Sequence, residues 1–137
     1  MKRSEYAIVI ILRVLGICAL GAIPAIFLPY TWMNAIHRFL GLGEMPDTPI
    51  VSYLARSLSM FYAMFGAITI FASLDVRRYR SLITLLAAIS VIVGIALFGI
   101  DYAAGMPLHW TVVEGPFTIG VGVAILWLQR QSKVKAQ

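Results

Sequence analysis

This sequence has little of the charge that keeps a soluble domain in water. Charged residues make up 12% of its 137 residues and hydrophobic residues 61%, against about 25% and roughly 45–50% in ordinary soluble domains. The mean hydropathy is +0.89. A chain of 15.1 kDa cannot hide so much apolar surface in its own interior. The composition therefore excludes a disordered chain and a soluble enzyme, and predicts one membrane-embedded domain over residues 1–137.

Cysteine and histidine are almost absent. The single cysteine, Cys18, excludes an internal disulfide and any cysteine-based zinc or iron–sulfur site within one chain. The two histidines, His37 and His109, form no pair at helical spacing, so we predict no metal site. The motifs of zinc peptidases, serine hydrolases and P-loop proteins are also absent. We predict no cofactor and no catalytic residue, and an enzyme is the less favoured class.

Four long apolar runs are what the sequence does contain. They cover about residues 7–28, 53–74, 82–100 and 112–128, near the roughly 20 residues that a spanning helix needs. Lipid cannot satisfy free backbone groups, so each run should be helical. The sequence predicts an all-α, integral membrane four-helix bundle. A cleaved signal peptide is the alternative for the first run, but Arg13 interrupts it and no small-residue cleavage site follows.

The basic residues predict how these helices are oriented. Of the eleven basic residues, Arg38 alone falls on the outer side of the expected membrane. Arg13 and Arg56 fall inside spans, and Asp75 is a candidate partner for Arg13. Eight of the eleven fall on one side of the expected membrane: Lys2, Arg3, Arg77, Arg78, Arg80, Arg130, Lys133 and Lys135. Because positive charge stays in the cytoplasm, both termini should lie there, in a bacterial inner (plasma) membrane. These charges indicate topology and give no support to nucleic-acid binding.

The long connection over residues 29–52 should contain a short amphipathic helix. Its apolar residues recur at helical spacing, and Gly41 and Gly43 follow them as a stop. The apolar residues are Trp32, Met33, Ile36, Phe39 and Leu40. Two placements fit this pattern: the helix lies in the outer headgroup layer, or it folds over the mouth of the bundle as a cap.

Small residues mark the expected contact face of the second span. Ala55, Ser59, Ala63 and Ala67 follow one another at strict four-residue spacing, and small residues let helices approach closely in lipid. So small a bundle has few interior positions. We therefore expect a homo-oligomer, or a partner that is itself a membrane protein.

Three charged residues are candidates for a cluster at the outer mouth. Arg56 lies 22 residues before Arg78 in the basic turn and Asp101 lies 23 after it, so antiparallel helices would bring them to one height. Each is badly placed alone, because Arg56 is near a helix N-terminus and Asp101 near a C-terminus. Glu114 could join them, with Tyr102 and His109 nearby. The cluster is either a buried ion pair that fixes helix register or a ligand site.

From the second span onward, the order of features resembles the DoxX-like and related four-span bacterial membrane proteins. The residues that carry the resemblance are Arg56, Tyr62, Gly66, the turn Asp75-Val76-Arg77-Arg78-Tyr79-Arg80, Gly94, Asp101, Gly105-Met106-Pro107 and Glu114-Gly115-Pro116. That group includes subunits of membrane oxidoreductase complexes. The resemblance implies the four-helix architecture and an accessory-subunit role, and it transfers no catalytic residue.

The favoured hypothesis is a non-enzymatic membrane module that assembles with itself or with a larger membrane complex. Two alternatives stay open. One is a binder or carrier of a lipophilic or anionic small molecule at the outer mouth, with Arg56 as the anchoring residue. The other is an accessory subunit of a membrane oxidoreductase.

Overall fold

The computed structural model describes residues 3–134, which are all-helical with no strand. Six helices follow in order: α1 (Arg3–Leu20), α2 (Ile23–Phe27), α3 (Tyr30–Phe39), α4 (Pro49–Leu74), α5 (Arg80–Ala103) and α6 (Leu108–Val134). Two of the basic residues used for the orientation, Lys2 and Lys135, lie outside the described residues.

Four helical segments of the described chain are long and apolar enough to cross a membrane. They are Arg3–Phe27, Pro49–Leu74, Arg80–Ala103 and Leu108–Ser132. The first is interrupted at Gly21 and Ala22, and Pro24 then occupies the first turn of α2. Proline is tolerated there because an N–H in the first turn has no partner within the helix. The all-α prediction with four apolar spans is confirmed.

The chain divides into two compact units, whose boundaries fall inside α1 and α4. The first unit comprises residues 1–13 and 71–137, and the second comprises residues 14–70. The first unit therefore holds the start of α1, the end of α4, and all of α5 and α6. The second holds the rest of α1 with α2, α3 and most of α4.

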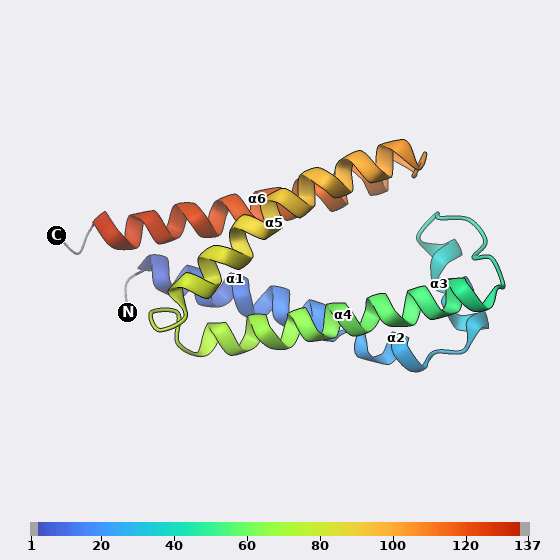
Figure 1. The fold of residues 1–137 in the computed structure, drawn as a ribbon, viewed down its shortest axis with the longest axis horizontal. Helices are drawn as coiled ribbons and strands as arrows, with labels where there is room; N and C mark the ends of the chain where they lie inside the picture. The colour runs from blue at the N-terminus through green and yellow to red at the C-terminus, as the bar shows by residue number, and fades with distance from the viewer. Residues whose placement is uncertain (1–2, 135–137) are drawn as a thin grey trace. The chain divides into compact units, whose positions relative to one another are not determined.

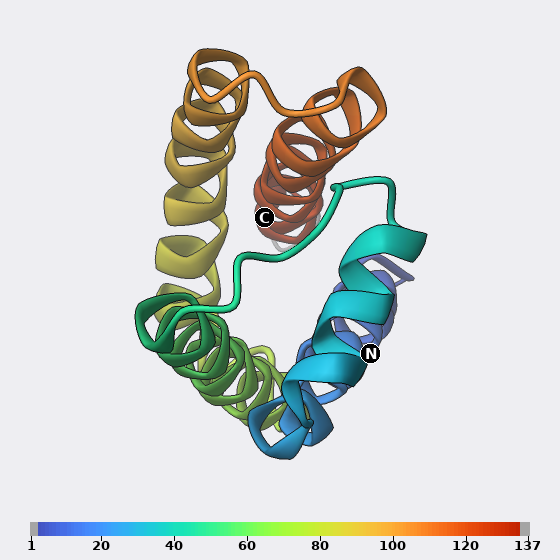
Figure 2. The same ribbon diagram turned by 90° about the vertical axis from the view of Figure 1, so that its right-hand side faces the viewer.

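In the first unit α5 and α6 form an antiparallel pair, joined by a short connection (Figure 1, Figure 2). Glycines bring their backbones together. A Cβ added to Gly94 would lie 2.8 Å from the carbonyl oxygen of Gly115, and one added to Gly122 would lie 2.6 Å from that of Ala87. Ordinary contacts of this kind are 3.4–4 Å. Only glycine permits such an approach, as expected where helices pack in lipid.

The core of the first unit lies at the end of the pair that is close to the α4–α5 turn. Residues from four helices and from the α4–α5 turn share it: Ile8, Val9, Leu12, Ala72, Val76, Ile83, Ala87 and Ile125. Ile83 and Ala72 are completely buried. This core fixes the start of α1 against the turn and the end of α6, and so positions the polar side chains described below.

In the second unit α1 and α4 lie side by side (Figure 1). They approach closely at Gly66, where an added Cβ would lie 2.8 Å from the carbonyl oxygen of Gly16. The segment after α3 is tied to that helix. Asn34 accepts a hydrogen bond from the Met45 N–H at 2.8 Å, and the Tyr30 hydroxyl donates to the Met45 carbonyl. Helix α3 and the segment that follows it therefore form one folded element.

Candidate functional site

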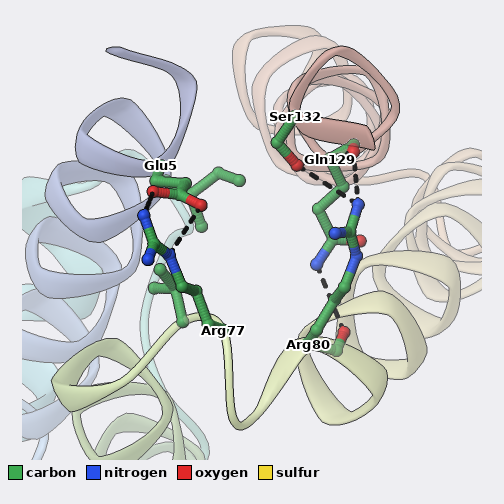
Figure 3. Close-up of a pocket in the computed structure, with 7 residues that line it drawn as sticks. Glu5, Arg77, Arg80, Gln129 and Ser132 are labelled. Carbon is green, nitrogen blue, oxygen red and sulfur yellow. Dashed lines mark hydrogen bonds and ion pairs between the residues drawn. The ribbon is translucent and has the colours of Figure 1, made fainter. Parts of the chain in front are cut away.

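The turn between α4 and α5 is held by its own aspartate. One carboxylate oxygen of Asp75 accepts the backbone N–H groups of Arg77 at 3.2 Å and Arg78 at 3.0 Å. A short polar side chain commonly closes a turn in this way. Asp75 makes no ion pair with Arg13 among the described residues, so it acts as a turn residue and the candidate pairing with Arg13 is absent. The turn sends Arg77 toward α1 and Arg80 toward α6 (Figure 3).

Arg77 forms a close ion pair with Glu5. Its Nε and Nη2 donate to the two carboxylate oxygens of Glu5 at 2.9 and 2.7 Å, the two-point geometry that suits guanidinium and carboxylate. The exposure is uneven: the Glu5 side chain is 12% exposed and that of Arg77 is 66% exposed. The hydrogen bonds from Arg77 to Glu5, and then the charge of Glu5, raise the pKa of the Arg77 guanidinium above its ordinary value. This pair joins the first turn of α1 to the α4–α5 turn.

Arg80 is held by neutral acceptors on α6. Its Nη2 donates to the Gln129 carbonyl at 2.6 Å and to the Ser132 hydroxyl at 3.2 Å (Figure 3). The Gln129 side chain is fixed in turn, because its amide donates to the Arg80 carbonyl at 3.2 Å and its oxygen accepts from Thr84 at 2.7 Å. Gln129 and Ser132 are buried. Hydrogen bonds to the buried residues Gln129 and Ser132 therefore hold the Nη2 end of the Arg80 side chain in place.

These side chains surround a cavity of about 400 Å³. Two apolar residues and five polar ones line it: Ile8, Val76, Glu5, Arg77, Arg80, Gln129 and Ser132. The apolar residues belong to the core, and the polar ones come from α1, the turn, α5 and α6. Such a mixture of apolar wall and a few converging polar groups is typical of a binding pocket.

The charged residues expected at the outer mouth are placed as follows. Arg56 of the second unit is exposed, and its Nη2 donates to the Leu28 carbonyl at 3.3 Å. Asp101 of the first unit is 5% exposed, and its Oδ2 has no hydrogen-bond partner within the part of the chain that the structure describes. Glu114 accepts a hydrogen bond from the Trp110 side chain. Arg56 and Asp101 belong to different units, so their pairing stays a prediction.

Two further members of the expected cluster flank these residues. Tyr102, next to Asp101, is 80% exposed. His109, in the first turn of α6, is also exposed. Along the described chain, no three His, Cys, Asp or Glu side chains gather as ligands for a metal ion.

The small residues of α4 differ in their surroundings. Ala55, Ser59 and Ala63 are half-buried, whereas Ala67 is exposed. The Ser59 hydroxyl donates to the Ala55 carbonyl one turn earlier at 2.9 Å. Within the second unit α4 approaches α1 closely at Gly66, which lies beside this stripe in the sequence.

Sequence reasoning missed the polar pocket. It used Arg77 and Arg80 as topology markers, and it gave no role to Glu5, Gln129 or Ser132. One signal was present: Gln129 and Ser132 are three residues apart at the end of an apolar span, a spacing that places two polar groups on one helix face. Nothing in the sequence showed that this face meets the start of α5.

None of the family models, curated proteins or solved structures compared with this chain matches it. The resemblance to DoxX-like proteins therefore stays a prediction.

Proposed function

We propose that the chain is a non-enzymatic membrane module that assembles with copies of itself or with a larger membrane protein. The observation that carries this proposal is a bare face of small residues on α5. Ala96, Gly99 and Ala103 lie on one side of this helix and are all exposed, and a Cβ added to Gly99 would meet no atom within 4 Å.

The other small residues of α5 illustrate what such a face does. Gly94 and Ala87 lie against glycines of α6, where backbones approach closely. In lipid, close packing rather than the hydrophobic effect holds helices together, so small residues that face no neighbour within their own unit are suited to contact with a further helix. The bare face of α5 thus supports an intermolecular contact.

The proposed orientation places both termini in the cytoplasm, with α3 at the outer surface. The excess of Lys and Arg on the side of the termini and of the α4–α5 turn supports it. A C-terminal fusion to a reporter protein that is fluorescent only in the cytoplasm should therefore be fluorescent. A full-length fusion protein without fluorescence would contradict the proposed orientation.

Two matched variants test the assembly. Gly99→Leu and Gly120→Leu each add the same side chain at a helical glycine with no atom within 4 Å of the added Cβ, so neither should disturb the folded chain. Crosslinking in intact membranes should show multimers for the wild-type chain and for Gly120→Leu, and fewer for Gly99→Leu. Equal amounts of multimer in all three chains would refute a role of the α5 face in assembly. Monomers alone in all three chains would refute assembly itself.

A further inference from the structure

Among the residues that the structure describes, the lining of the polar pocket carries one positive charge that no acid balances. Its charged lining residues are Glu5, Arg77 and Arg80. Glu5 and Arg77 neutralise one another in their two-point ion pair. Arg80 makes no ion pair among residues 3–134. Because an arginine keeps its charge at any physiological pH, the pocket has a net charge of one positive unit.

Arg80 also has hydrogen-bond donors to spare. A guanidinium carries five N–H groups, and both printed bonds of Arg80 come from Nη2. In the described chain Nε and Nη1 have no acceptor. The bonds to Gln129 and Ser132 fix the guanidinium in place, so a ligand would not have to order a loose side chain. The remaining N–H groups, one on Nε and two on Nη1, can each donate a charge-assisted hydrogen bond to an anion such as phosphate.

The position of the pocket indicates the source of the anion. Its wall includes the apolar Ile8 and Val76, and the aromatic residues Tyr6 and Trp127 are each 58% exposed on the helices that border it. Aromatic side chains of this kind concentrate at the level of lipid headgroups. Basic pockets between spanning helices at the cytoplasmic surface suit anionic lipid headgroups.

We propose that this pocket binds a phosphate group, with Arg80 as the residue that recognises it and the headgroup of an anionic membrane lipid as its source. Glu5 and Arg77 shape one wall and hold the turn, while Gln129 and Ser132 hold the guanidinium. The assignment of the lipid to the inner leaflet rests on the proposed orientation. The pocket itself is separate from the bare face of α5 and does not depend on assembly.

The test compares two arginines of the same turn. Arg80→Gln removes the unbalanced charge of the pocket, whereas Arg78→Gln removes an equal charge from an exposed residue that does not line it. The full-length chain is purified in detergent, and binding of phosphatidylglycerol and of phosphatidylcholine is measured by native mass spectrometry. We expect the wild-type chain to prefer phosphatidylglycerol. Arg80→Gln should weaken that binding by about tenfold or more, the effect of losing a charged hydrogen-bond donor, and Arg78→Gln should leave it nearly unchanged.

A third variant protects the test against misfolding. Arg80→Lys keeps the charge but replaces the planar array of guanidinium donors by one ammonium group, and it should bind phosphatidylglycerol with intermediate affinity. Equal losses in Arg78→Gln and Arg80→Gln would overturn the proposal, because they would indicate diffuse surface attraction. Unchanged binding in Arg80→Gln would overturn it as well.

Inorganic phosphate separates the two sources of the same chemistry. If millimolar phosphate leaves phosphatidylglycerol bound to the wild-type chain, the lipid headgroup is the ligand. If phosphate displaces the lipid and binds in an Arg80-dependent way, the pocket is a phosphate site with a soluble ligand. If neither binds, the pocket is not a phosphate site and the inference is wrong.

Discussion

Adding one methyl group at two neighbouring glycines of α6 should have opposite effects on stability. Gly122 packs against α5, and a Cβ there would lie 2.6 Å from the Ala87 carbonyl oxygen and 2.8 Å from a methyl carbon of Val91. Gly120, two residues away, would gain a Cβ with no atom within 4 Å. The variants Gly122→Ala and Gly120→Ala therefore differ only in what the added methyl group meets.

The size of the difference follows from these distances. Ordinary contact begins at 3.4 Å, so the Gly122→Ala methyl is too close to a backbone oxygen that cannot rotate away. The helices must separate, and such overpacking costs about 1–3 kcal/mol. Gly120→Ala meets nothing and should gain up to about 1 kcal/mol, because alanine is the better helix former. The gain in helix preference applies equally to both variants and cancels between them, so we expect the two free energies of unfolding to differ by the overpacking cost, about 1–3 kcal/mol.

Reversible unfolding in mixed micelles, followed by tryptophan fluorescence, measures this difference. Gly120→Ala is the matched control, because it makes the same chemical change on the same helix. Equal stabilities of the two variants would refute the described packing of α5 on α6.

Three further predictions concern charged and titrating groups. Arg77→Gln should lower the melting temperature more than Glu5→Gln, because it removes the two-point guanidinium partner of a carboxylate that is only 12% exposed, whereas the Arg77 released by Glu5→Gln is 66% exposed and open to water. A larger effect of Glu5→Gln would contradict this uneven burial. If Arg56 pairs with Asp101, the charge swap Arg56→Asp with Asp101→Arg should recover stability that each single change loses, and a double variant no better than either single would refute the pairing. Burial first, and then the charges of Asp47 and Glu44, raise the pKa of Tyr30 above 10.0, so its contribution to stability should be complete below pH 10 and lost as pH rises through the higher value. The ultraviolet titration of the wild-type chain minus that of Tyr30→Phe should have its midpoint above 10.0, and a midpoint at or below that value would contradict the shift.

The architecture could be predicted from the sequence because lipid leaves an apolar run few choices. Lipid offers no hydrogen-bond partner to the backbone of an apolar segment such as residues 82–100, so the segment must form a helix, and α5 is that helix. The interruption of the first span was harder to place. Pro24 predicts a kink, but the break falls at Gly21 and Ala22, because a proline is accommodated in the first turn of a new helix.

Which small residues make contact could not be predicted. Gly120 and Gly122 are alike in the sequence, yet only Gly122 packs against another helix. Rotation of a helix about its axis decides this, and that rotation depends on the partner. The polar pocket was missed for a related reason. Glu5 and Arg77 are 72 residues apart, and only the shared core around Ile8 and Val76 brings them together.

Native mass spectrometry of the chain, extracted gently from its own membrane, tests the proposed assembly most directly. Assembly predicts a mass that is a multiple of 15.1 kDa, or that includes a second polypeptide. A monomer mass at every protein concentration, unchanged by Gly99→Leu or by Ala63→Leu, would contradict the proposed assembly.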